Sequence, residues 1–380
     1  MPLLAKLPNG TYVALCEADV DKNYCASHLR GGSGALLSVE WAPDQSGAVS
    51  AEYPARSPWR AAIIADDLNT LINSTLVDNL SPASEILDTS WIKGGRAAWD
   101  WGAGITPSYA SAIQLVDFAA EMGWEYVTLD AGWDPTYIPD VVQYPAPKGI
   151  GIWLWAHLND LDTEAEVNSN LPLWASFGIK GMKVDFFESD SQSMMEKYEK
   201  ITEKAEELHL LLNYHGCTKP TGWERRWPNI LSMEGIKGNE YYLWSDGNTA
   251  ENTCTLPFTR GLAGPADYTP VMYSNNKNQT TWAHQTAFAL IMHSNLINFC
   301  DHYDVYRSFI TKDFLSALPV DYDETKLIEG SVGDYATIAR KKGNDWFIGS
   351  ISNGARIAEI PLDFLGDGQY QAYLYQDGFC

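Results

Sequence analysis

Two stretches of the sequence decide the fold: GIGIWLWAH at residues 149–157 and GIKGMKVDFF at residues 178–187. Each is a short apolar run that opens on glycine and ends at polar residues, which is typical of a strand buried in a parallel sheet. The segment between them mixes polar and apolar residues and is long enough for one crossover helix. The pair therefore predicts a strand–helix–strand unit.

The same alternation extends from about Trp91 to about Phe309. Further strands are predicted at 97–102, 124–132, 208–216, 229–235 and 295–301, with a weak one at 267–271, and two of the helices at 108–123 and 191–208. Eight strands alternating with helices predict a (β/α)8 TIM barrel, an α/β fold whose active site lies at the carboxyl ends of the strands.

The flanking regions have a different pattern. Residues 1–85 hold the strand-like segments TYVALCEA, GALLSVEW, GAVSAEY and WRAAIIA, and are interpreted as a partial N-terminal β-sandwich and linker. Residues 86–317 would form the barrel. Residues 318–380, with DYATIARKKGNDWFIGSISN and QYQAYLYQDG, predict a partial C-terminal β domain with a hairpin at KKGND.

Charge narrows the choice of partners. The 380 residues include 49 Asp+Glu and 26 Lys+Arg, a formal net charge of −23, which argues against nucleic-acid or anionic-membrane binding. No apolar run reaches the roughly 18 to 20 residues needed to span a bilayer, and the first residues show no secretory signal peptide. The six cysteines are scattered, so separate buried thiols are expected; a Cys16–Cys25 disulfide stays open, and zinc is not expected.

Several acidic residues fall at the ends of predicted strands. Asp100, Asp130 and Asp185 follow the first, second and fourth strands, and they should point into the mouth of the barrel. Lys183 lies two residues before Asp185 and so shares its strand face. That pair suits a nucleophilic carboxylate beside a hydroxyl-binding lysine, although Asp185 in this position also suits a helix cap, and the spacing leaves both roles open.

Glu234 and Glu240 bracket the loop EGIKGNE, whose two glycines permit tight turns. Two glutamates and backbone carbonyls are hard oxygen ligands, which predicts Ca2+ as the metal. The alternative is a pair of solvated loop glutamates.

The aromatic content points to sugars. The chain has 15 Trp and 20 Tyr, many near strand ends, as in WDW, DAGW and WLWAH. Flat apolar faces flanked by carboxylates suit a sugar-binding site. Most of these rings are still expected in the core, and Asp130, Lys183, Trp155 and His157 are the predicted sugar contacts.

Seven segments, in order, carry a family resemblance: WIKGGRAAWDW, YVTLDAGW, KGIGIWLWAH, GIKGMKVDFF, LLNYHGCTKPTGWERRWPN, SMEGIKGNEYYLW and PFTRGLAGPADYTP. Together they resemble glycoside hydrolase family 97, whose members are α-glucosidases and α-galactosidases with an N-terminal β-sandwich, a (β/α)8 barrel and a C-terminal β domain. Members are considerably longer, so the chain is interpreted as truncated at both ends.

The resemblance implies roles for four acidic residues. Glu240 matches the general acid and also touches the calcium ion, which Glu234 ligates. Glu17 matches the glutamate that the N-terminal domain contributes to the same ion. Asp185 matches the nucleophile of the retaining branch, and Gly216 stands where inverting members carry a glutamate base. In a retaining enzyme the two catalytic carboxyl groups should lie about 5 to 5.5 Å apart.

The resemblance therefore implies a calcium-dependent retaining exo-α-glycosidase, first of all an α-galactosidase, acting on an α-galactoside or another α-linked oligosaccharide. An α-glucosidase of the same family is the first alternative, and an inactive sugar-binding fragment is the alternative of another class. By resemblance the setting is periplasmic or extracellular, and a monomer is predicted.

Overall fold

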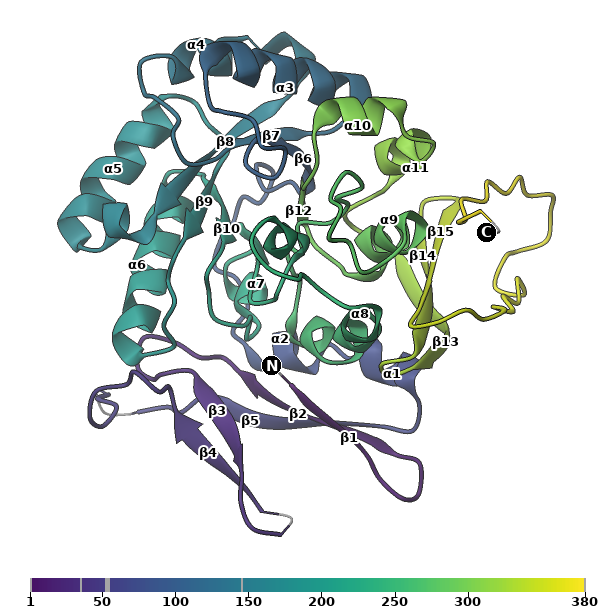
Figure 1. Ribbon diagram of the computed structural model, residues 1–380. Coiled ribbons are helices and arrows are strands. Elements are labelled where there is room, and N and C mark those ends of the chain that lie inside the picture. The colour runs from purple at the N-terminus through teal and green to yellow at the C-terminus, as the bar shows by residue number, and fades with distance from the viewer. Residues whose placement is uncertain (1, 35, 52–54, 145, 379–380) are drawn as a thin grey trace.

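The computed structural model describes residues 2–34, 36–51, 55–144 and 146–378, and its centre is a curled sheet of seven parallel strands (Figure 1). The strands are β6 (Gly95–Trp99), β7 (Tyr126–Leu129), β8 (Gly151–His157), β9 (Gly181–Asp185), β10 (Leu211–Tyr214), β11 (Ile230–Met233) and β12 (Leu296–Phe299). Their order is β11-β10-β9-β8-β7-β6-β12, which is that of a nearly closed barrel. The predicted TIM-barrel fold is confirmed.

The weak strand expected at 267–271 is wrong. The described backbone there forms no strand, and Thr269 (φ 48°) and Val271 (φ 68°) adopt left-handed conformations that a strand cannot contain. The segment still touches its neighbour, because the Cys300 amide donates to the Pro270 carbonyl at 3.1 Å. An irregular stretch thus lies where the eighth strand was expected, between β11 and β12.

Helices surround the sheet (Figure 1). They are α3 (Tyr109–Met122), α4 (Ile138–Gln143), α5 (Glu164–Ser176), α6 (Gln192–Glu207), α7 (Trp223–Arg226), α8 (Ala250–Thr255), α9 (Trp282–Ile291), α10 (Tyr303–Ser308) and α11 (Lys312–Ala317). Short 3-10 turns are η1 (Ala146–Lys148), η2 (Leu158–Leu161), η3 (Asn239–Leu243), η4 (Leu256–Phe258) and η5 (Arg260–Ala263). The predicted helix at 108–123 is α3, capped by the Ser108 side chain and ended by Gly123 in the left-handed region. The predicted helix at 191–208 is α6.

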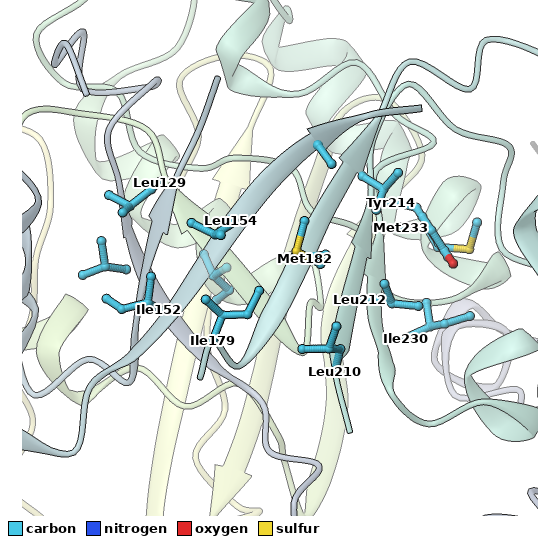
Figure 2. Packing of buried hydrophobic residues seen from close by; sticks show 14 of the residues in the cluster. Leu129, Ile152, Leu154, Ile179, Met182, Leu210, Leu212, Tyr214, Ile230 and Met233 are labelled. Atoms are coloured by element: carbon cyan, nitrogen blue, oxygen red, sulfur yellow. The ribbon is translucent and has the colours of Figure 1, made fainter. Parts of the chain in front are cut away.

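Strand residues alternate between two cores. Leu129, Ile152, Leu154 and Met182 belong to the large cluster that joins the sheet to its helices (Figure 2). The alternate positions on the same strands face the barrel interior, where a smaller cluster closes one end: Ala97, Tyr126, Trp153, Leu211, Leu231 and Leu296. The interior positions nearer the carboxyl ends are therefore free to carry polar groups.

The N-terminal region contains a three-stranded antiparallel sheet and a hairpin. The sheet has the order β1 (Leu3–Lys6), β2 (Tyr12–Ala18), β5 (Trp59–Ala65), and the hairpin is β3 (Ser27–Gly31) with β4 (Leu37–Trp41). Two short helices, α1 (Leu68–Ile72) and α2 (Leu76–Leu80), lead on toward the barrel. Of the expected segment GAVSAEY, residues 47–51 form no strand, and residues 52–53 lie outside the described residues.

The C-terminal region forms a sheet with the order β13 (Glu324–Ser331), β14 (Tyr335–Lys342), β15 (Asp345–Ser352). The predicted hairpin is present, since Lys342 pairs with Asp345. The strand expected in QYQAYLYQDG is wrong: residues 369–378 have no regular structure, and Tyr373 and Leu374 are exposed. An alternating pattern alone does not make a strand, because β propensity depends on pairing and packing that residues 369–378 do not have here.

The five described cysteines are free thiols, so the Cys16–Cys25 disulfide is not formed; Cys16 and Cys217 are only partly buried. Among the described residues, no helix combines the length and apolar character needed to cross a membrane.

Candidate active site

The strand register stacks polar side chains toward the carboxyl ends of β8, β9 and β10. Trp155 on β8 pairs with Lys183 on β9, and His157 pairs with Asp185. Lys183 pairs in turn with Asn213 on β10. Because inward-facing residues alternate along each strand, these side chains form layers above the apolar end of the barrel interior.

Lys183 is the centre of the first polar cluster. Its buried Nζ lies 2.9 Å from Asp130 Oδ2 and 3.6 Å from Asp185 Oδ2, and 4.7 Å from the ring centre of Trp99. Trp99 Nε1 also donates to Asp130 Oδ2 at 2.7 Å. Burial alone would lower the pKa of Lys183, but the charges of Asp130, Asp185 and Glu240 hold this pKa above its usual value. Lys183 is thus a fixed cation.

Asp185 ends β9 with donors on both carboxylate oxygens. Oδ1 accepts from the Phe186 amide at 2.7 Å, and Oδ2 accepts from Trp155 Nε1 at 3.2 Å. The cap of the next helix, α6, is Ser191. The helix-cap role left open for Asp185 by the sequence is therefore wrong.

Asp100 follows β6 and contacts this cluster through Asp130. Its Oδ1 accepts from the Asp130 amide at 2.8 Å, while the buried Oδ2 has no hydrogen-bond partner among the described residues. Burial, and then the charge of Asp130, raise the pKa of Asp100 to about 8. At neutral pH the group is mostly protonated, so it can donate a hydrogen bond.

The second polar cluster contains Glu234, Glu240 and His215, whose potential ligand atoms all lie within 4.8 Å of one another. His215 Nδ1 is 3.6 Å from Glu240 Oε1 and 3.9 Å from Glu234 Oε2. Burial raises the pKa of Glu234 to about 8, against the opposing charge of His215, and the Glu240 carboxylate adds to the rise. For Glu240 burial acts in the same direction, but His215 and Lys183 outweigh it and lower the pKa of Glu240 to about 2. The pair therefore holds one proton at neutral pH, on the Glu234 side.

Asp267 fixes the orientation of His215. Its fully buried carboxylate accepts from His215 Nε2 at 2.9 Å, from Asn213 Nδ2 at 3.1 Å and from Asn298 Nδ2 at 2.6 Å. Burial and Lys183 would lower the pKa of His215, yet Glu234, Asp267 and Glu240 together raise it to about 10. His215 is thus an imidazolium whose Nδ1 faces both glutamates.

Arg260 and Thr269 shape the loop that carries these glutamates. The buried Arg260 donates to five backbone carbonyls, those of Met233, Glu234, Gly235, Gly264 and Pro265. Thr269 Oγ1 accepts from the Glu240 amide at 3.1 Å. The loop is therefore held by residues distant in sequence.

Gly216 joins the two clusters. Its amide donates to Glu234 Oε2 at 2.8 Å, and its φ is +50°. A Cβ there would lie 2.9 Å from the Phe186 nitrogen and 3.1 Å from Asp185 Oδ1. A side chain at this position would therefore require the backbone at Phe186 to shift and the Asp185 carboxylate to give way by a few tenths of an ångström.

The predicted residues fall into three places. Asp130, Lys183, Trp155 and Asp185 lie together, with the His157 ring beside them on the same edge of the sheet. Glu234 and Glu240 form the second cluster, and their hard oxygens fit a calcium ion.

Glu17 is not part of that group. Its oxygens pair with Arg60 at 2.7 Å and Lys219 at 2.9 Å and accept from Ser27. Glu17 thus reaches the barrel through Lys219, and two cations already compensate its charge.

The roles of Asp267, Arg260 and Thr269 were not predicted. All three lie in the quoted motif PFTRGLAGPADYTP, so the signal was present, but only the folded chain shows what they contact.

Comparison with known proteins adds three family matches. Residues 1–82 match the model described as glycosyl-hydrolase 97 N-terminal, residues 91–236 that of glycoside hydrolase 97, and residues 321–379 that of glycosyl-hydrolase 97 C-terminal, oligomerisation. The matches cover successive parts of the chain. The description of the last family names oligomerisation. The monomeric state expected from the sequence therefore stays a prediction.

Individual proteins agree with these matches. The chain is 36% identical over 391 aligned positions to a "Probable retaining alpha-galactosidase" of Streptomyces bingchenggensis, covering 97% of this chain and 60% of the relative. It is 31% identical over 438 positions to a "Retaining alpha-galactosidase" of Bacteroides thetaiotaomicron, covering 100% and 65%. A crystal structure of a β-arabinopyranosidase superposes with a TM-score of 0.85 at 27% identity, covering 93% of this chain and 62% of that one. The chain thus spans 60% to 65% of the length of these curated relatives.

Proposed function

Because the chain belongs to glycoside hydrolase family 97, we propose that it is a retaining exo-α-glycosidase, an α-galactosidase that acts by double displacement. The observation that carries the proposal is the environment of Asp185. This carboxylate ends β9, has Lys183 3.6 Å away and accepts from Trp155, and Gly216, which has no Cβ, packs closely beside it. A carboxylate so placed suits attack on an anomeric carbon.

In the first step Asp185 forms a bond to the anomeric carbon as the bond to the glycosidic oxygen breaks, and that oxygen takes a proton from Glu240. The proton comes from the Glu234–Glu240 pair, which holds one at neutral pH. In the second step Glu240 accepts a proton from water, whose oxygen attacks the same carbon and releases Asp185. Lys183 and Asp130 are placed to bind hydroxyls of the sugar, with Trp155 and His157 beside them.

We further propose that Glu234 and Glu240 hold Ca2+. The ligand atoms of these two buried glutamates and of His215 lie within 4.8 Å of one another, and carboxylate oxygens are the hard ligands that Ca2+ prefers. When bound, the ion would compensate the charge on Glu234 and leave the shared proton to Glu240. Glu17 would have to exchange Lys219 for the ion. Added Ca2+ should raise the melting temperature of chelator-treated protein and have no effect on a Glu234→Gln variant; equal stabilisation of both would reject the site.

A second candidate function follows from the β-arabinopyranosidase likeness. A β-L-arabinopyranoside has the ring stereochemistry of an α-D-galactoside without the hydroxymethyl group. Both sugars would present the same hydroxyls to the cluster around Lys183.

The test compares aryl α-galactoside, aryl β-L-arabinopyranoside and aryl α-glucoside as substrates, with NMR of the first-formed anomer. Fastest release from the galactoside with retention is expected, and Asp185→Asn should lower kcat by at least about 10³-fold. First release of the inverted anomer, or normal turnover by that variant, would reject the mechanism. If the protein binds a galactoside but does not hydrolyse it in the presence of Ca2+, the alternative of an inactive sugar-binding fragment would be indicated.

Two further variants identify the acid. Glu240→Gln should lose most activity on galactosides with poor leaving groups, because such groups need a proton in order to leave. The same variant should keep more activity on an activated aryl galactoside, whose leaving group departs without a proton. If Glu234→Gln shows this pattern instead, Glu234 is the acid.

A further inference from the structure

Phe186 and Phe187 are adjacent in the sequence but differ in burial. Phe187 is buried, stacked on Tyr198 with ring centres 4.0 Å apart and edge-on to Tyr214. Phe186 keeps 46% of its surface exposed. The apolar ring of Phe186 therefore lies outside both cores of the barrel, directly after the proposed nucleophile.

The backbone holds Phe186 in a strained conformation. Its φ is +68°, in the left-handed region that a bulky residue rarely adopts. Two hydrogen bonds maintain the turn: the Phe186 amide donates to Asp185 Oδ1, and the Glu188 amide donates to the Gly216 carbonyl, both at 2.7 Å. The bond from the Phe186 amide to Asp185 Oδ1 therefore both orients the carboxylate and holds the backbone that presents the Phe186 ring.

One face of this ring rests on a fixed support. The His157 ring stacks on it with centres 4.8 Å apart and planes inclined by 12°, and Trp155 lies edge-on at 6.3 Å. His157 is itself immobilised, because its Nδ1 accepts from the Asn159 amide at 3.0 Å. Phe186 directly follows Asp185 at the carboxyl end of β9, beyond the buried Lys183 of the same strand.

From this arrangement we propose that the Phe186 ring, supported by His157, is the binding platform for the leaving group of the substrate, an aryl group or the apolar face of a second sugar. The inference rests on the proposed function. The sugar that reacts must engage the buried polar groups, so the part of the substrate that extends outward past Asp185 is the leaving group. A flat apolar surface binds an aryl ring or the CH face of a sugar ring.

The test uses two galactosyl donors that differ only in the leaving group: α-galactosyl fluoride, whose fluoride is too small to cover a ring, and 4-nitrophenyl α-galactoside. The key variant is Phe186→Gly, because glycine adopts a positive φ without strain, and the turn should therefore be preserved. Phe186→Trp keeps a ring, and Leu173→Ala removes an exposed apolar side chain from the last part of α5, far along the helix from its start at the barrel mouth.

Phe186→Gly should raise KM for the aryl galactoside about 3- to 10-fold and leave kcat/KM for the fluoride nearly unchanged. Phe186→Trp and Leu173→Ala should behave like the wild type on both donors. An equal loss on both donors would show that the ring supports the reacting sugar or Asp185, and no loss on either would show that it binds nothing; each result overturns the inference while leaving the α-galactosidase proposal intact. A wild-type protein inactive on both donors would overturn both.

Discussion

The two sides of the barrel mouth are built differently. The strand half, β6 to β10, presents Asp130, Lys183 and Asp185 from the ends of regular parallel strands. The loop half, residues 234–295, presents Glu234 and Glu240 from irregular backbone after β11. In the strand half the two-residue period and the register set the positions of the side chains. In the loop half they depend on contacts with residues far away in the sequence.

This difference has an energetic consequence. A side chain on a strand keeps its place when one neighbour is removed, because the ladder of backbone hydrogen bonds remains. A side chain on the loop half depends on a connected buried network of Arg260, Asp267 and Thr269, and such networks fail when one member is lost. Four substitutions or conditions test this contrast.

The largest effect is expected at Gly216, where the two halves meet. Gly216→Ala places a Cβ 3.1 Å from Asp185 Oδ1 at a φ of +50°, so the carboxylate must move, and kcat should fall about 10²-fold or more. Gly343→Ala is the matched control, since Gly343 has a φ of +60° and no atom near its Cβ position. If steady-state kinetics show the same small change for both variants, the close packing of Gly216 against Asp185 has no functional role.

Arg260 should be the main anchor of the loop half. Arg260→Met leaves five carbonyls without their donor and should lower the free energy of unfolding by about 3 kcal/mol. Urea unfolding measures the change. Arg30→Met removes only an exposed ion pair with Glu40 and should change the free energy of unfolding far less, because water screens exposed pairs; similar losses for both variants would contradict the anchoring role.

Acid should destabilise the loop half through the buried imidazole of His293. The backbone carbonyl of His293 accepts from the Ala266 amide. Burial is the main cause that lowers the pKa of the His293 imidazole to about 4, and the charge of the neighbouring Arg340 adds to the effect. The unfolded chain binds this proton near pH 6.5, so the contribution to stability is complete above that pH and is lost as the pH falls toward 4.

Between pH 7.5 and pH 4.5 the titration of His293 should lower the free energy of unfolding by about 2 kcal/mol. The measurement is the free energy of unfolding at pH 7.5 and 4.5, for the wild type and for His293→Asn. The variant should lose less on acidification. A parallel decline of the two proteins would show that His293 does not titrate between these pH values.

The smallest effect is expected at Thr269. Thr269→Ala removes the hydroxyl that accepts from the Glu240 amide, and kcat should fall about 3- to 10-fold, in keeping with one hydrogen bond of about 1 kcal/mol. Thr269→Ser keeps the hydroxyl and should restore most of the rate. Equal rates for the alanine and serine variants would mean that this bond does not position Glu240.

The contrast also explains where the sequence-based predictions succeeded. The seven strands, the helices α3 and α6 and the β14–β15 hairpin were predicted because periodicity and turn residues are local properties. The predictions were wrong at 267–271 and 369–378, where the structure has no strand. Left-handed residues at Thr269 and Val271 prevent the first, and the second pairs with none of the described strands.

For the site, the sequence by itself determined which groups lie at strand ends: Asp130, Lys183 and Asp185, because a residue's face on a strand follows from its position. Only the tertiary structure decided that His215 lies between Glu234 and Glu240, that Asp267 orients it, and that Glu17 is paired with Arg60 and Lys219. The physical reason is that buried charges take their partners from whichever segments the fold brings within a few ångströms, and separation along the chain places no limit on that choice.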